Sequence, residues 1–176
     1  MSSDFNKDAL LRSAKRINVS YFKEQQEDAI NAIWQWWQSQ SISFTLSGYA
    51  GTGKTFIMRH LVRYLIVEKV CVTAPTHKAL RVLENSSGKK GMTIQSLCGL
   101  RPDVDIEDYN IENPSFKVIG EQKMRGYRLV IIDECSMINP GLFNLLIKTA
   151  IQCRCKLLFL GDELQIPYVV KRMKGE

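Results

Sequence analysis

The sequence predicts an α/β fold, a single parallel sheet with helices on both faces. Short apolar runs alternate with amphipathic helical patterns along the 176 residues, an order typical of βαβ units. Three of the four apolar runs are dense in Val, Ile, Leu or Phe, as strands must be when both faces of a sheet are covered. The first run leads into a glycine-rich loop and then into a helical pattern. Because this length fits one compact domain, we expect residues 21–176 to form it, after an extension over residues 1–20.

The first predicted element is an amphipathic helix over residues 21–38, in which apolar side chains recur at helical spacing among Glu and Gln. Trp34 and Trp37 share the face of Ile30 and Ile33, so we interpret both tryptophans as core anchors. A platform for base stacking is the alternative interpretation of these two rings.

Strands are predicted at residues 42–47, 70–74, 128–133 and 156–161, with helices at 54–67, 76–84 and 140–151. The last helix has Asn139 as its N-cap and Pro140 at its first position, which satisfies open backbone N–H groups and presets the helical φ angle. Residues 101–127 show no sustained period, which is long for an unstructured connection in a compact domain. We therefore expect a functional segment there.

The composition excludes several classes of protein. With 45% hydrophobic and 24% charged residues, the chain is not wholly disordered, collagen-like or a coiled coil. The longest uncharged stretch, residues 29–53, is interrupted by polar side chains, and the first 16 residues carry six charges without an apolar segment. We therefore expect no membrane-spanning helix, no secretory signal, and a location in the cytoplasm, or in the host cytoplasm if the protein is viral.

The net charge of +6 is unevenly distributed. Residues 101–114 contain one Arg and five carboxylates, so the remaining chain carries +10. Such an excess favours a polyanionic partner, and a solvated basic surface is the alternative.

The five cysteines are scattered among apolar neighbours, and no two have CxxC spacing. We interpret them as reduced thiols of the core. A metal or redox role for Cys153 and Cys155 is the alternative.

Residues 48–55 read GYAGTGKT and fit the pattern G-x4-G-K-[ST] between a predicted strand and a predicted helix. The glycines let backbone N–H groups turn toward phosphate oxygens, Lys54 can reach the β- and γ-phosphates, and Thr55 can ligate Mg²⁺. We therefore predict a magnesium-nucleotide site. Its predicted binding residues in this region are Gly48, Ala50, Gly51, Thr52, Gly53, Lys54, Thr55 and Phe56.

Two adjacent carboxylates, Asp133 and Glu134, end the third predicted strand downstream of this loop. In such a site Asp133 would hold the metal, directly or through its water, and Glu134 would orient or deprotonate the attacking water. The fourth strand ends in another polar cluster, residues 161–165. Because ligands of open α/β sheets bind at the carboxyl ends of the strands, these groups should meet at one edge.

In this order the motifs resemble the first RecA-like motor domain of a superfamily 1 DNA helicase of the RecD-like and phage Dda type. The resemblance covers roughly residues 20–170 and implies a P-loop NTPase (RecA-like) fold. It implies an activity that couples hydrolysis of ATP with Mg²⁺ to translocation on single-stranded DNA and 5′ to 3′ duplex unwinding. It also implies that Gln26 selects adenine, and that Gln165 senses the γ-phosphate. The catalytic set implied by the resemblance is Lys54, Asp133, Glu134 and Gln165.

Two further segments resemble family motifs that contact single-stranded DNA. Residues 74–79, APTHKA, resemble motif Ia, and residues 93–97, TIQSL, resemble motif Ib. The DNA-binding residues implied are Pro75, Thr76, His77, Lys78, Thr93 and Ser96. The segment at 101–127 occupies the place of the family's small pin subdomain.

Residues 161–167, GDELQIP, resemble motif III of the family. The family's second motor domain, which brings the arginines that complete the ATP site, does not follow this motif within the 176 residues. The resemblance therefore implies a second RecA-like motor domain as a partner, in cis or in trans. Tyr168 also departs from the family, since many relatives have a second proline there. An arginine that stabilises the transition state raises the rate of phosphoryl transfer by about 10³–10⁵-fold. Because the second domain supplies these arginines in the family, the alternative function is a nucleotide-dependent module that binds ATP and DNA without appreciable turnover.

Overall fold

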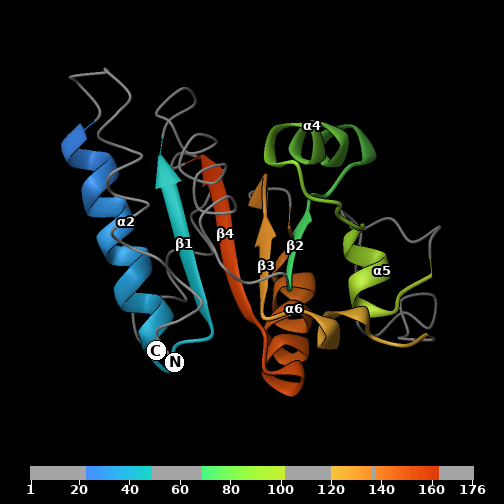
Figure 1. Ribbon diagram of the computed structural model, residues 1–176. Coiled ribbons are helices and arrows are strands. Elements are labelled where there is room, and N and C mark those ends of the chain that lie inside the picture. The colour runs from blue at the N-terminus through green and yellow to red at the C-terminus, as the bar shows by residue number, and fades with distance from the viewer. Residues whose placement is uncertain (1–22, 49–68, 102–119, 136–137, 163–176) are drawn as a thin grey trace.

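The computed structural model describes residues 23–48, 69–101, 120–135 and 138–162. These residues form one parallel sheet with helices packed on both of its faces (Figure 1). The strands are β1 (Ser43–Gly48), β2 (Val70–Thr73), β3 (Leu129–Ile132) and β4 (Lys156–Asp162). Their order across the sheet is β1-β4-β3-β2, and every neighbouring pair is parallel. The predicted fold class and all four predicted strands are confirmed to within two residues.

The described helical elements are α2 (Lys23–Gln38), α4 (His77–Ser87), α5 (Ile94–Cys98), the 3-10 helix η3 (Lys123–Gly126) and α6 (Pro140–Cys153). The N-cap predicted for α6 is confirmed, because the Asn139 side chain accepts a 2.9 Å hydrogen bond from the Leu142 backbone N–H. The helix predicted at residues 54–67 lies outside the described residues.

The sheet separates two hydrophobic clusters, and alternate residues of β2, β3 and β4 enter opposite ones. On one face, α2 and α4 bury Ile30, Ile33 and Leu83 against the sheet. On the other face, α5, η3 and α6 bury Leu97, Met124 and other apolar side chains. Both faces are dry because the strand residues alternate between the clusters and are buried in each.

The buried tryptophan of α2 is not one of the two that the sequence pattern indicates. Trp36 is 5% exposed, and its ring lies 5.7 Å from that of Phe44 on β1. Trp34 and Trp37 pack against the same cluster but are only half-buried, so their interpretation as core anchors is partly correct. The position of β1 beside α2 selects the face with Trp36, a tertiary constraint that helical periodicity does not contain.

The C-terminal part of residues 101–127 belongs to the core, against the expectation of a segment without regular structure. Met124 on η3 is completely buried in the cluster with α5 and α6. Gly120 donates a backbone hydrogen bond of 3.0 Å to Gly99, which joins the two ends of the segment. A short apolar turn such as η3 carries too little periodicity to be predicted. Residues 102–119 lie outside the described residues.

All five cysteines are buried and free, which confirms their interpretation as core thiols. Burial raises the pKa of the Cys71 thiol to about 11, and that of Cys98 and of Cys155 to about 12. These thiols are therefore protonated and poor nucleophiles at neutral pH.

Lys156, the first residue of β4, ties the C-terminal end of α2 to the sheet. Its Nζ donates hydrogen bonds to the backbone carbonyls of Trp36, Ser39 and Ser41 at 3.0, 2.8 and 2.7 Å. The ammonium also lies 4.9 Å from the centroid of the Trp36 ring. A cation at the carbonyl end of a helix complements the helix dipole.

Replacing Lys156 with Met should lower the free energy of unfolding by about 2 kcal/mol, because three carbonyl groups lose a charged donor. Two of these carbonyls belong to exposed residues, where water can replace the ammonium, so the loss stays below the sum of three charged hydrogen bonds. Denaturation by urea measures the effect. Lys148→Met on the exposed surface of α6 is the matched control, with an expected change within about 0.5 kcal/mol. Equal losses of unfolding free energy in both variants would show that the three hydrogen bonds from Lys156 do not stabilise the fold.

Candidate nucleotide and nucleic-acid site

The carboxyl ends of the four strands point to one edge of the sheet, toward the top of Figure 1. β1 ends at Gly48, the first residue of the predicted phosphate-binding loop, and Gly48 lies opposite Asp162 in the register with β4. Asp133 directly follows β3 and donates its backbone N–H to Thr73 at the end of β2 (3.0 Å). The start of the phosphate loop and the acidic end of β3 are therefore at the same edge, with β4 between their strands.

Several predicted site residues are outside the part of the chain that the structure describes. Gln26 lies on α2, which places its backbone but not its side chain. The residues predicted to bind the nucleotide or the metal, or to act catalytically, that lie outside are Ala50, Gly51, Thr52, Gly53, Lys54, Thr55, Phe56 and Gln165. For these residues the roles stay predictions.

The turn after β3 separates the two adjacent carboxylates. Asp133 is half-buried, and its Oδ1 accepts a 2.8 Å hydrogen bond from the Glu134 backbone N–H. Glu134 is exposed and has φ 52°, a left-handed conformation that costs a non-glycine residue about 1 kcal/mol or more. The following residue, Cys135, is completely buried. The turn thus anchors one carboxylate at the edge and directs its neighbour to solvent.

The carboxylate at this edge has the chemistry of a magnesium ligand. Among the described residues, no group of three or more His, Cys, Asp or Glu side chains is arranged to bind a metal ion. Mg²⁺ in nucleotide sites typically takes one or two protein oxygens and completes its shell with phosphates and water. A single ordered carboxylate such as Asp133 suits that mode.

The predicted motif Ia forms the N-terminus of α4. The Thr76 hydroxyl accepts a 3.2 Å hydrogen bond from the Ala79 backbone N–H and so caps the helix. Thr76, His77 and Lys78 are exposed and Pro75 is half-buried, just beyond the carboxyl end of β2. These four side chains therefore lie on a surface that a ligand can reach.

The predicted motif Ib lies on the other side of β2. Thr93 caps α5 by accepting a 3.2 Å hydrogen bond from the Ser96 backbone N–H. Met92 donates its backbone N–H to Val72 on β2 at 3.2 Å. The structure thus connects motifs Ia and Ib, 17 residues apart at their threonines, through one short strand.

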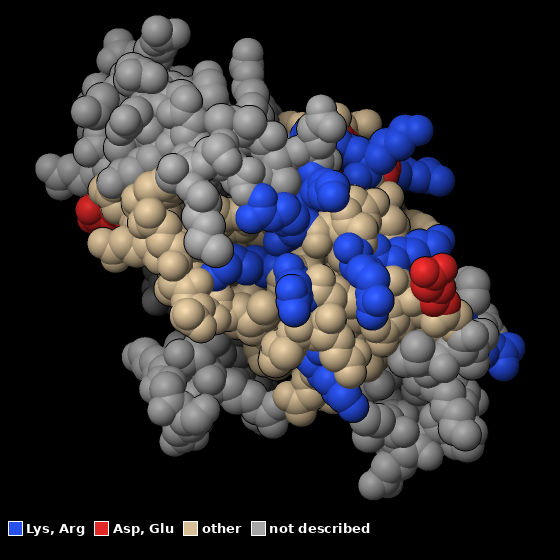
Figure 2. Space-filling view, turned by 60° about the horizontal axis from the view of Figure 1, so that its bottom comes forward, with Lys and Arg blue, Asp and Glu red and all other residues tan. Residues whose placement is uncertain are grey.

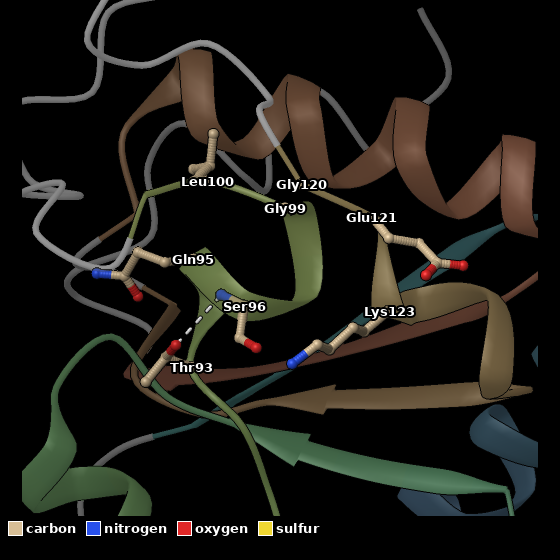
Figure 3. A pocket seen from close by; sticks show the side chains of 8 residues that line it. All are labelled: Thr93, Gln95, Ser96, Gly99, Leu100, Gly120, Glu121 and Lys123. Carbon is tan, nitrogen blue, oxygen red and sulfur yellow. Dashed lines mark hydrogen bonds between the residues drawn. The ribbon is translucent and has the colours of Figure 1, made fainter.

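A groove of about 440 Å³ runs beside motif Ib (Figure 3). Thr93 and Ser96 line one wall, and the Lys123 side chain extends from η3 on the other wall toward the Ser96 side. The lining residues are Thr93, Gln95, Ser96, Gly99, Leu100, Gly120, Glu121 and Lys123. Sequence reasoning did not identify Lys123, because only the fold brings η3 next to α5.

Gly91 is a second residue that the sequence pattern does not reveal. A Cβ atom at this position would lie 2.3 Å from the Val72 carbonyl oxygen and 2.6 Å from Leu80 Cδ1. Its backbone N–H also donates a 2.8 Å hydrogen bond to Glu84 Oε1. Only glycine lets the chain approach β2 closely enough to place motif Ib beside it.

A comparison with families of known proteins agrees with this arrangement. Residues 26–171 match the family described as AAA domain. The chain belongs to this AAA domain family. The match includes the predicted phosphate loop, both DNA motifs and both acidic strand ends, so the AAA domain accounts for all of the described sheet.

Individual relatives of this AAA domain are helicases or uncharacterised proteins. The ATP-dependent DNA helicase dda of Enterobacteria phage T4 is 33% identical over 146 residues, covering 81% of this chain and 32% of the helicase. An uncharacterised protein of Acanthamoeba polyphaga mimivirus is 35% identical over 143 residues, covering 72% and 29% of the two chains. This chain therefore spans about a third of the length of these curated relatives.

A solved structure has the same fold. The crystal structure of Bacteroides sp Pif1 in complex with ADP-AlF4 matches with a TM-score of 0.55 and 25% sequence identity. The match covers 86% of this chain and 34% of the Pif1 chain. Together these similarities confirm the resemblance to a RecA-like domain of superfamily 1 helicases of the Dda and Pif1 type.

None of the described helices combines the length and the apolar character needed to cross a bilayer.

Proposed function

We propose that this AAA domain is the ATP-binding motor domain of a DNA helicase. In the complete motor it would couple hydrolysis of ATP to translocation on single-stranded DNA and to duplex unwinding in the 5′ to 3′ direction. The observation that carries the proposal is the shared carboxyl edge, where the start of the phosphate loop at Gly48 lies on the same side of the sheet as Asp133 and Thr76. Helicase relatives that share this region support it.

The proposed nucleotide site divides its work among residues from different strands. Backbone N–H groups of the loop at 50–53 and the Lys54 ammonium would bind the phosphates, while Gln26 would contact the adenine. Thr55 and Asp133 would hold Mg²⁺, which neutralises charge on the phosphates when bound.

Glu134 is the proposed base for the attacking water. Its exposed position, set by the left-handed turn, lets it meet a water molecule without competing with Asp133 for the metal. Gln165 would report the state of the γ-phosphate to the DNA-binding segments.

The proposed DNA path runs over motifs Ia and Ib. Thr76, His77 and Lys78 at the exposed start of α4 offer hydroxyl, imidazole and ammonium groups to a phosphate backbone. Thr93 and Ser96 line the groove beside α5. A second RecA-like motor domain, in cis or in trans, would supply the other half of this path and the arginines that complete the ATP site.

Lys54→Ala tests the nucleotide site. Removing the ammonium that balances the β- and γ-phosphates should lower ATP turnover by about 10²-fold or more, and should weaken ATP binding. Phosphate release with and without single-stranded DNA measures turnover, and a fluorescent ATP analogue measures binding. Lys148→Ala on exposed α6 is the matched control and should behave as the unsubstituted chain. Equal turnover of the two variants would overturn the proposed site.

The same experiment separates the motor from a module that only binds. Tight ATP binding with turnover near background, and no gain when the second motor domain is supplied separately, would favour the binding module. Turnover that rises when this second domain and single-stranded DNA are both present would support the motor.

A further inference from the structure

The edge of the sheet opposite the proposed nucleotide site is strongly basic. Figure 2 turns the amino ends of the strands toward the viewer and shows Lys and Arg side chains gathered across the middle, with acidic side chains at the margins. Four basic residues lie at the start of β4 or one or two residues before β2, β3 or β4 at this edge. We call Lys69, Arg128, Arg154 and Lys156 the amino-edge row.

Backbone hydrogen bonds place three of these residues side by side. Arg128 donates its backbone N–H to Lys69 at 2.9 Å, and Lys156 donates its backbone N–H to Arg128 at 2.9 Å. The three residues therefore lie where neighbouring strands begin, and such strands are about 4.8 Å apart in a sheet. Such a row concentrates positive charge along a line rather than at a point.

Arg154 extends the row in an unfavourable backbone conformation. It ends α6 with φ 54°, in the left-handed region where glycine is the usual residue. Its side chain is exposed, and its backbone N–H is bonded to the carbonyls of Ala150 and Ile151. Glycine would form the same cap without the steric cost, whereas the arginine places an exposed positive charge at this position.

An aromatic ring lies beside these cations. The guanidinium of Arg128 is 5.9 Å from the centroid of the half-buried Trp37 ring on α2. Lys156 keeps its ammonium on backbone carbonyls of α2 and contributes charge to the row from that position. A line of cations with a partly exposed tryptophan suits a sugar-phosphate backbone with bases to stack, and an acidic peptide would use only the charges.

We propose that the amino-edge row binds single-stranded nucleic acid at a second site, on the side of the sheet opposite motifs Ia and Ib. The proposal rests on the proposed function for its ligand, a single-stranded nucleic acid. It adds a binding surface outside motifs Ia and Ib. With β4 seven residues long, the two edges are about 20 Å apart, so one strand must pass around the domain to reach both.

The test is the salt dependence of binding to a fluorescently labelled oligothymidylate, measured by anisotropy without nucleotide. The variant combines Lys69→Gln with Arg154→Gly, two exposed positions of the row. If each side chain neutralises one phosphate, the slope of log affinity against log salt falls by about 1.4, and binding at about 0.1 M salt weakens by about 25-fold. Arg154→Gly alone should melt at or above the temperature of the unsubstituted chain, which excludes unfolding as the cause.

A charge-conserving control uses the same positions. Lys69→Arg with Arg154→Lys should keep the slope and the affinity, because phosphate contacts need charge at these sites. ATP turnover measured without DNA should be unchanged in both double variants. The Lys54→Ala experiment tests the proposed function, so a failure of that function can be told apart from a failure of this proposal. An unchanged slope in the first pair would overturn the proposal. The proposal would also be overturned if polyglutamate displaced the oligothymidylate from the unsubstituted chain but not from the variant with Lys69→Gln and Arg154→Gly. The amino-edge row would then bind an acidic polypeptide.

Discussion

Glu134→Gln is expected to reduce ATP turnover by about 10²–10⁴-fold while leaving ATP affinity nearly unchanged. The amide keeps the size of the side chain and its position after the turn, but it cannot accept a proton from the attacking water. Because Asp133 holds its own hydrogen bond to the Glu134 backbone N–H, the substitution leaves the proposed metal ligand in place. Single-turnover hydrolysis and equilibrium binding of a fluorescent ATP analogue measure the two quantities separately.

Two comparison variants sharpen this result. Glu121→Gln, at an exposed glutamate that lines the groove beside motif Ib, should keep full turnover when hydrolysis is measured without DNA. Glu134→Gly should lose turnover yet be no less stable, because glycine relieves the left-handed backbone at φ 52°. If Glu134→Gln hydrolyses ATP as fast as Glu121→Gln, another group must activate the water.

Raising the pH from 9 to 11 is expected to destabilise the domain strongly. In the folded state burial raises the pKa of Cys71 to about 11 and of Cys98 and Cys155 to about 12, from the value of 9.0 in an unfolded chain. Above pH 9 the unfolded chain releases three protons that the folded chain keeps, so stability falls as pH rises. Each thiol contributes at most about 1.4 kcal/mol per pH unit, so the three together remove roughly 3 kcal/mol per unit between pH 9 and 11.

Urea denaturation at a series of pH values, in the presence of a reductant, measures this slope. Below about pH 7.5 the thiols contribute almost no pH dependence, because they are protonated in both states. Lys156 opposes the fall with a smaller term near its ordinary pKa of 10.5, since burial lowers its folded value. Cys98→Ala should lessen the alkaline slope by about 1.4 kcal/mol per pH unit, and an unaltered slope in this variant would contradict the thiol origin.

Much of this domain follows from local sequence. The runs at β2, β3 and β4 contain enough consecutive apolar residues to require burial on both faces, and they predict strands in a parallel sheet. The caps are also local, because Thr76 and Asn139 bond to backbone N–H groups three residues ahead. The phosphate-loop motif and the acidic ends of two strands are equally visible without a structure.

The elements, the motifs and the family can therefore be predicted from short stretches of sequence. The tertiary structure places β4 between the strands of Gly48 and Asp133, and it makes Trp36 the buried tryptophan of α2. It also decided that Lys123 faces motif Ib and that Lys69, Arg128 and Lys156 form a row. The physical reason is that periodicity and capping act over a few residues, whereas pairing of strands and packing of faces join residues tens of positions apart.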